Sequence, residues 1–172
     1  MHDNIKKRIN IAAKRQPADL VIKNCKIVNV FTHEIIEGDI AISDGKIAAV
    51  GNYSGEKEVD AEGRYALPGF INSHIHIESS FVSPEEFSRL VVPHGTTTII
   101  ADPHEIVNVC GMDGFDYMVK AGKNAALDIK YMIPSCVPCT PWEHAGAVVD
   151  SKAISEVINQ DKVFGMGEFM NT

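Results

Sequence analysis

Two histidines at alternate positions, His74 and His76, stand in the stretch FINSHIHIESS. Residues two apart on a β-strand point to the same face, so a strand here would place both imidazoles side by side. Neutral imidazole is a common ligand of divalent metal ions in proteins. The pair therefore predicts a metal site, although two strand histidines can also be held by hydrogen bonds alone.

A third potential ligand, Glu168, stands in the stretch VFGMGEFMN near the end of the sequence. A carboxylate can bridge two metal ions and hold a hydroxide between them. Gly165 and Gly167 beside it indicate that backbone or ligand approaches closely at this point. We expect Glu168 to be both a metal ligand and a catalytic residue; the alternative is a solvated charge at the end of a strand.

The stretch ADPHE places Asp102, His104 and Glu105 close together beside Pro103, which restricts the local backbone. We expect His104 and Glu105 to be catalytic proton carriers and Asp102 to contact the substrate. The same side chains could instead orient metal ligands. An Asp-Pro pair is also typical of a simple turn.

Three further residues are predicted to bind the substrate. Glu78 would share a strand face with the histidine pair, and Ser79 follows it, although a helix cap also explains a serine here. Glu143 follows the pair Cys136-x-x-Cys139. A structural zinc site needs four ligands, and the sequence has no second pair of this kind, so a loop that lines the pocket is favoured over a zinc knuckle.

After Pro68 the sequence alternates between strand-like and helix-like stretches, which predicts a parallel sheet in an α/β fold. Its strand stretches recur roughly every 30 residues, as in a (β/α)8 barrel of about 250 residues. Residues 68–172 therefore predict the first half of such a barrel, with the site residues at the carboxyl ends of its strands. The expected strands are Phe70–His76, Thr96–Ala101, Leu127–Ile133 and Val163–Glu168, and the expected helices are Pro84–Val92, Asp113–Asn124 and Ser151–Gln160.

Residues 1–67 predict a separate, smaller domain. Residues 1–16 resemble an amphipathic helix with Ile5, Ile9 and Ala13 on one stripe, and Pro17 would end it. The following stretch alternates apolar and polar residues, with a hairpin turn at Asp44-Gly45. We expect a small antiparallel sheet of about four strands, forming part of a composite β-sandwich.

The composition limits the classes of partner. The sequence has 172 residues, 45% of them hydrophobic and 23% charged, which is typical of a globular protein. Its net charge of −7 argues against a nucleic-acid partner. No apolar run is long enough to cross a bilayer, and the polar start is unlike a signal peptide. Four cysteines in a sequence of this length do not suggest a disulfide framework, so we expect a cytoplasmic protein.

The stretch LPGFINSHIHIESS resembles the amidohydrolase superfamily, in which a His-x-His pair stands on the first strand of a metal-dependent barrel. The extended pattern is similar to the bacterial adenine deaminases, because further motifs follow in the matching order. These motifs are Asp102-Pro103-His104-Glu105, Ser135-Cys136-Val137-Pro138 and Gly167-Glu168-Phe169-Met170-Asn171.

This resemblance implies hydrolysis of adenine to hypoxanthine and ammonia in purine salvage, by a homo-oligomer with two divalent ions, Mn²⁺ in the first place and Fe²⁺ or Zn²⁺ as alternatives. It implies that His74 and His76 bind one ion and that Glu168 bridges both. The hydroxide between the ions would attack the ring carbon that carries the amino group, and a carboxylate would pass a proton to the ring nitrogen and the departing ammonia.

Asn72 and Cys139 depart from the family pattern, and the ligands expected on strands five, six and eight are not in this sequence. We therefore expect a fragment of a longer enzyme that is inactive alone. Two alternatives stay open: another amidohydrolase that acts on a cyclic amide, similar to dihydroorotase or imidazolonepropionase, or a truncated, non-catalytic interaction module.

Overall fold

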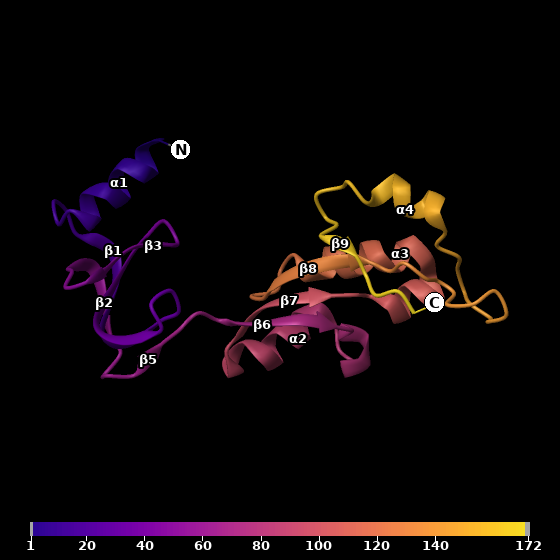
Figure 1. Cartoon of the computed structure of the whole chain (residues 1–172), viewed down its shortest axis with the longest axis horizontal. Helices are drawn as coiled ribbons and strands as arrows, with labels where there is room; N and C mark the ends of the chain where they lie inside the picture. The colour runs from indigo at the N-terminus through magenta and orange to yellow at the C-terminus, as the bar shows by residue number, and fades with distance from the viewer. Residues whose placement is uncertain (1, 171–172) are drawn as a thin grey trace. The chain divides into compact units, whose positions relative to one another are not determined.

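The computed structural model describes residues 2–170 and divides the chain into two compact units, Met1–Pro68 and Gly69–Thr172 (Figure 1). Each unit has its own sheet. Among the described residues, no helix combines the length and the apolar character that crossing a membrane requires.

The N-terminal unit is one helix and a five-stranded sheet in which β3, β2, β1 and β4 follow one another and β5 also pairs with β1. The prediction of an antiparallel sheet is wrong in part, because β1 pairs antiparallel with β2 but parallel with β4 and β5. The composite sandwich stays a prediction. The elements are α1 (His2–Ala12), β1 (Ala18–Asn29), β2 (Glu34–Ser43), β3 (Lys46–Gly51), β4 (Gly55–Asp60) and β5 (Tyr65–Ala66).

The hairpin at Asp44-Gly45 is confirmed, since β2 and β3 pair up to Ser43 and Lys46 on either side of it. Asp44 and Gly45 have φ angles of 53° and 69°, as a two-residue turn between twisted strands requires.

The predicted N-terminal helix is confirmed as α1, but the side that it buries differs from the expected apolar stripe. Ile5 and Ile9 are exposed, whereas Ile11 is fully buried in a small core with Ala18, Val21 and Ala41. The helix also ends at Ala12, before it reaches Pro17.

The C-terminal unit is a parallel sheet in the order β6-β7-β8-β9, as the alternation of strands and helices predicted (Figure 1). Four parallel strands joined through helices form a partial half-barrel. The elements are β6 (Phe70–Ile75), η1 (Ile77–Ser80), α2 (Pro84–Val91), η2 (Val92–His94), β7 (Thr96–Ala101), α3 (His104–Gly122), β8 (Asp128–Ile133), α4 (Ser151–Val157) and β9 (Gly165–Met166).

Two element boundaries differ from the prediction in ways that affect the site. Helix α3 begins at His104 rather than at Asp113, and Gly111, with φ 61° and ψ −145°, interrupts it. The sequence therefore indicated only the half of the helix after this glycine. Strand β9 is two residues long, so Glu168 lies beyond the strand that was expected to contain it.

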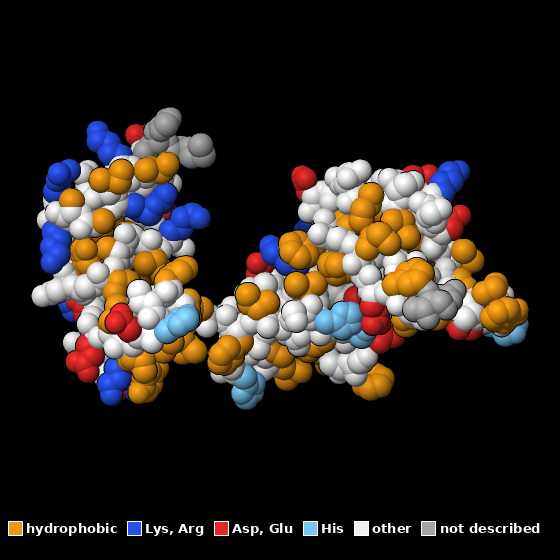
Figure 2. Space-filling model, in the orientation of Figure 1, with side chains coloured by type: hydrophobic (Ala, Val, Ile, Leu, Met, Phe, Trp, Pro, Cys, Tyr) orange, Lys and Arg blue, Asp and Glu red, His pale blue; other side chains and the backbone are white. Residues whose placement is uncertain are grey.

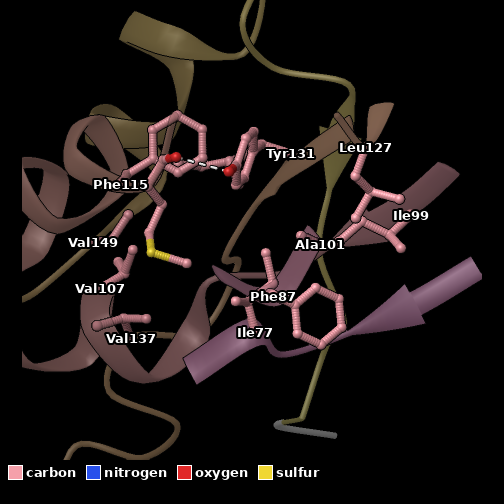
Figure 3. Packing of buried hydrophobic residues seen from close by; sticks show 12 residues of the cluster. Ile77, Phe87, Ile99, Ala101, Val107, Phe115, Leu127, Tyr131, Val137 and Val149 are labelled. Atoms are coloured by element: carbon pink, nitrogen blue, oxygen red, sulfur yellow. Dashed lines mark hydrogen bonds between the residues drawn. The ribbon is translucent and has the colours of Figure 1, made fainter. Parts of the chain in front are cut away.

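The core of this unit lies between the sheet and its helices (Figure 3). Phe115 on α3 packs edge-on against Tyr131 on β8, with ring centroids 6.4 Å apart. The Tyr131 hydroxyl donates a hydrogen bond to the Met118 carbonyl at 2.7 Å, so the one polar atom of this buried ring is satisfied. The other buried members are Ile77, Phe87, Ile99, Ala101, Val107, Leu127, Ile133, Val137 and Val149.

Candidate metal centre

The carboxyl ends of three strands carry the candidate ligands. His74 lies in β6, His76 directly follows this strand, Asp102 directly follows β7, and Glu168 lies two residues beyond β9. In a parallel sheet these ends meet at one edge, which is where barrel active sites are built. The N–H of His74 donates to the Asn72 side chain at 3.2 Å, at a point where the pairing of β6 with β7 is irregular.

His74, His76 and Glu168 converge, and their ligand atoms lie within 4.8 Å of one another. The two histidine Nε2 atoms are 3.2 Å apart. Glu168 Oε1 lies 3.3 Å from His76 Nε2, and Oε2 lies 3.7 Å from His74 Nε2. Figure 2 shows histidine and acidic side chains next to one another on the visible face of this unit.

The tautomer of His76 follows from its partner. Its Nδ1 lies 2.7 Å from the carbonyl oxygen of Asp102, which can only accept, so Nδ1 carries the proton. In the neutral ring, Nε2 then presents a lone pair toward the Glu168 carboxylate and toward the second imidazole. Electron-rich atoms that face one another in this way fit a divalent cation, and the hydrogen bond at Nδ1 is the usual partner of a ligating histidine.

The electrostatics around His76 also favour a positive charge at this place. Burial lowers the pKa of His76, but the hydrogen bond to the Asp102 carbonyl and the nearby carboxylates of Glu105, Asp102 and Glu168 raise it, and the net pKa is above its ordinary value. Glu105 Oε2 lies 3.3 Å from His76 Nδ1.

Asp102 is a buried neighbour of Glu168, and its predicted contact with the substrate stays a prediction. The residue is fully buried, and its Oδ2 accepts a hydrogen bond from the backbone N–H of Glu168 at 2.9 Å. Its Oδ1 has no hydrogen-bond partner among the described residues, and Asp102, His104 and Glu168 bring ligand atoms within 4.8 Å of one another.

His104 and Glu105 lie on the first turn of α3, and both line a pocket beside His76. His104 is buried, and its Nε2 donates to the Cys136 carbonyl at 3.0 Å, so Nδ1 faces Asp102 Oδ1 at 3.7 Å. Glu105 is open to solvent and accepts a hydrogen bond from the Ser79 hydroxyl at 2.8 Å. Ser79 thus contacts a predicted proton carrier.

Glu78 was expected on the same face as the histidine pair, but it turns toward helix α3. Its Oε1 accepts the backbone N–H of Ile106 at 3.2 Å, in the first turn of the helix. Its Oε2 is buried and has no hydrogen-bond partner among the described residues. Burial raises the pKa of Glu78 above its ordinary value.

The pocket beside His76 and Glu168 has a volume of about 310 Å³ and is lined by residues from four segments that lie far apart in the sequence. Glu143 lies on its wall, as a residue of the predicted pocket-lining loop, and Cys139 lies beside it. The sequence did not indicate Asn108, which lies four residues after His104 and so on the same face of α3. Had the helix been recognised from its true start, this spacing would have indicated it. The lining residues are His76, His104, Glu105, Asn108, Cys139, Glu143, Glu168 and Met170.

A model of the amidohydrolase family matches residues 65–169. This chain belongs to the amidohydrolase family. The matched span includes His74, His76 and Glu168.

The relatives of this amidohydrolase chain include adenine deaminase 2 of Desulfotalea psychrophila, which is 62% identical over 167 residues, 97% of this chain and 29% of the relative. An adenine deaminase of Geobacillus kaustophilus is 53% identical over 171 residues, 99% of this chain and 30% of the relative. The chain thus spans less than a third of the length of these relatives.

Two solved structures are similar to this chain in fold. D-hydantoinase from Thermus sp. aligns with a TM-score of 0.53 and 24% identity, over 67% of this chain and 27% of that one. Atrazine chlorohydrolase TrzN from Arthrobacter aurescens TC1, solved in complex with zinc, aligns with a TM-score of 0.52 and 20% identity, over 67% of this chain and 36% of that one. At this level of identity the likeness concerns the fold alone.

Proposed function

We propose that this chain supplies the first part of the active site of an adenine deaminase, which hydrolyses adenine to hypoxanthine and ammonia. The observation that supports it most directly is the convergence of His74, His76 and Glu168 at one sheet edge, in a chain 62% identical to a relative named adenine deaminase 2. Because the relatives are more than three times as long, the activity belongs to a longer protein that contains this chain.

In this proposal His74 and His76 hold one divalent ion through their Nε2 atoms. Glu168 adds a carboxylate whose two oxygens face the two imidazoles. A divalent ion at such a site lowers the pKa of a coordinated water toward ~7 and so makes a nucleophile available at neutral pH. We propose Mn²⁺ as the native ion, with Fe²⁺ and Zn²⁺ as alternatives, since imidazole and carboxylate ligands suit all three.

Deamination requires protons at the ring nitrogen and at the departing ammonia, so a group that accepts and returns protons must stand near the substrate. Glu105 meets this need best, because its carboxylate is open to solvent, lines the pocket and lies 3.3 Å from His76 Nδ1. Glu143 offers a second carboxylate on the same pocket wall, and we propose that it contacts the substrate. His104 donates a hydrogen bond to the Cys136 carbonyl and forms part of the pocket wall on the side of α3.

We propose that the longer protein is a cytoplasmic homo-oligomer of purine salvage. The four cysteines are all free, which suits a reducing compartment.

An assay of ammonia release tests the function. The longer protein encoded by the reading frame that contains this chain should release ammonia from adenine, and Glu168→Gln should lower kcat at least ~100-fold. Glu56→Gln, at an exposed position of the N-terminal sheet, serves as the matched control. Hydrolysis of a cyclic amide without ammonia release from adenine would refute this proposal and favour the dihydroorotase-like alternative. If the protein turns over neither substrate, the proposal is refuted in favour of a truncated, non-catalytic interaction module.

A further inference from the structure

We propose that Asp102 and Ser135 are positioning residues that hold Glu168 by its backbone, from two different strands, and so fix the place of its carboxylate. This inference rests on the proposed role of Glu168 as a metal ligand. It assigns to Asp102 a task other than contact with the substrate.

The backbone of Glu168 needs partners outside the sheet because β9 is short. The strand consists of Gly165 and Met166, and the last backbone hydrogen bond to its neighbour runs from the Gly167 N–H to the Ile133 carbonyl at 2.7 Å. Glu168 therefore lies past the end of the sheet ladder. Its own N–H and C=O must find other partners if its side chain is to keep one position.

Asp102 supplies the partner on the N–H side. Its Oδ2 accepts the Glu168 N–H at 2.9 Å, and the residue is fully buried at the end of β7. A charged acceptor makes this hydrogen bond stronger than one between neutral groups. Gly167 makes the approach possible, because a Cβ at this position would overlap Asp102 Oδ2.

Residues that follow β8 supply the partners on the C=O side. The Ser135 hydroxyl donates to the Glu168 carbonyl at 2.7 Å, and the Cys136 thiol donates to the same oxygen at 3.6 Å. The Cys136 sulfur also accepts the N–H of Met170 at 3.2 Å. The peptide groups on both sides of the Glu168 Cα are thus bonded to side chains that directly follow β7 and that follow β8.

Asp102 contacts both sides of the candidate centre. Its carbonyl oxygen accepts the Nδ1 proton of His76, while its carboxylate accepts the Glu168 N–H. One residue therefore sets which nitrogen of His76 is free and where Glu168 stands opposite it. Partners that orient metal ligands in this way typically change metal affinity by ~10- to 100-fold.

The test measures Mn²⁺ binding by electron paramagnetic resonance in the longer protein that contains this chain, with each substitution made in that protein. Asp102→Ala should weaken binding at least ~10-fold and change the signal of the bound ion, because Glu168 loses its fixed position. Asp102→Asn should stay within ~3-fold of the wild type, since the amide oxygen can still accept the Glu168 N–H. Ser135→Ala should weaken binding by a smaller factor. Ser155→Ala, which removes an exposed hydroxyl on α4, should change nothing.

The outcomes separate this inference from the proposed metal centre. If Glu168→Gln weakens binding but Asp102→Ala and Ser135→Ala do not, the positioning role is refuted and the centre stands. If the wild-type longer protein does not bind Mn²⁺, or if its Glu168→Gln variant binds it equally well, both are refuted. Should Asp102→Ala fail to fold, Ser135→Ala decides, together with hydrogen exchange of the Glu168 amide in the wild type, which must be slow if Asp102 holds it.

Discussion

Glu168 Oε1 lies 3.3 Å from His76 Nε2, although the two residues stand near opposite ends of the C-terminal unit's sequence. The parallel order β6-β7-β8-β9 accounts for this proximity, because each strand brings its carboxyl end to the same edge. With the proton of the neutral His76 ring at Nδ1, both of these atoms are acceptors, and they face one another without a hydrogen between them. A cation between them removes this conflict.

Replacement of His76 by alanine should lower the affinity of the chain for Mn²⁺ at least ~10-fold, since it removes a direct ligand, whose loss should cost no less than that of an orienting partner. His94→Ala is the matched control, because His94 is exposed on η2, away from the centre. Isothermal titration calorimetry measures both. Equal affinities of the two variants would exclude His76 as a ligand.

Gly167→Ala should displace Glu168, because the added methyl group would overlap the Asp102 carboxylate, which is buried and cannot move aside. We expect a loss of Mn²⁺ affinity of ~10-fold or more. Gly165→Ala adds the same methyl group where it meets only the flexible end of Met132 at 3.1 Å, so its affinity should change little. A calorimetric titration in which both variants bind like the wild type would contradict the packing described here.

Asp39→Asn should destabilise the N-terminal unit by about 1 to 2 kcal/mol at pH 7. The buried Asp39 carboxylate accepts hydrogen bonds from the Lys23 ammonium at 2.6 Å and from the N–H groups of Asn24 and Tyr53. An amide can satisfy only part of this set of donors. Glu34→Gln on the exposed start of β2 is the control, with an expected change within ~0.5 kcal/mol.

The ion pair between Lys23 and Asp39 makes the stability of the N-terminal unit depend on pH. Burial raises the pKa of Asp39, but its hydrogen bonds from Lys23, Tyr53 and Asn24 lower it, and the net pKa is below its ordinary value. The carboxylate thus stabilises the unit above the pKa of the unfolded chain, ~3.9, and this contribution is lost as the pH falls through the lower native value. Urea titrations followed by NMR of the β2 amides should show the difference between wild type and Asp39→Asn shrinking below about pH 4; a constant difference would be inconsistent with this.

Phe115→Ala should destabilise the C-terminal unit by about 3 to 5 kcal/mol, because the ring is fully buried against Tyr131 and leaves a cavity. Phe81→Ala, at a position 95% exposed, should cost less than ~0.5 kcal/mol. Urea unfolding followed by NMR of the β8 amides measures both. Similar midpoints for the two variants would mean that the core does not depend on Phe115.

The sequence predicted the parallel sheet and the meeting of His74, His76 and Glu168, because strand periodicity and the carboxyl-end rule need only residue types and spacing. It predicted the wrong direction for the pairing of β1 with β4, since an alternating pattern is typical of antiparallel neighbours and these two strands are parallel. Residue types and spacing are local properties of the sequence, whereas the direction of strand pairing depends on segments that lie far apart.

The role of Asp102 could not be predicted for a related reason. Its hydrogen bond to the Glu168 N–H depends on the register of strands whose sequences lie far apart, and no local pattern reports that register. The start of α3 was missed because Gly111 is a common helix breaker, although here it interrupts a helix that continues on both sides. Because the start of α3 was missed, Asn108 was missed as well, since no other signal in the sequence indicated it.

The most direct test of the account is anomalous X-ray scattering from crystals of this chain grown with Mn²⁺. The account predicts one anomalous peak at bonding distance, about 2.0 to 2.3 Å, from the Nε2 atoms of His74 and His76 and from a Glu168 oxygen. A peak bound only elsewhere, or none at these three residues at saturating Mn²⁺, would contradict it.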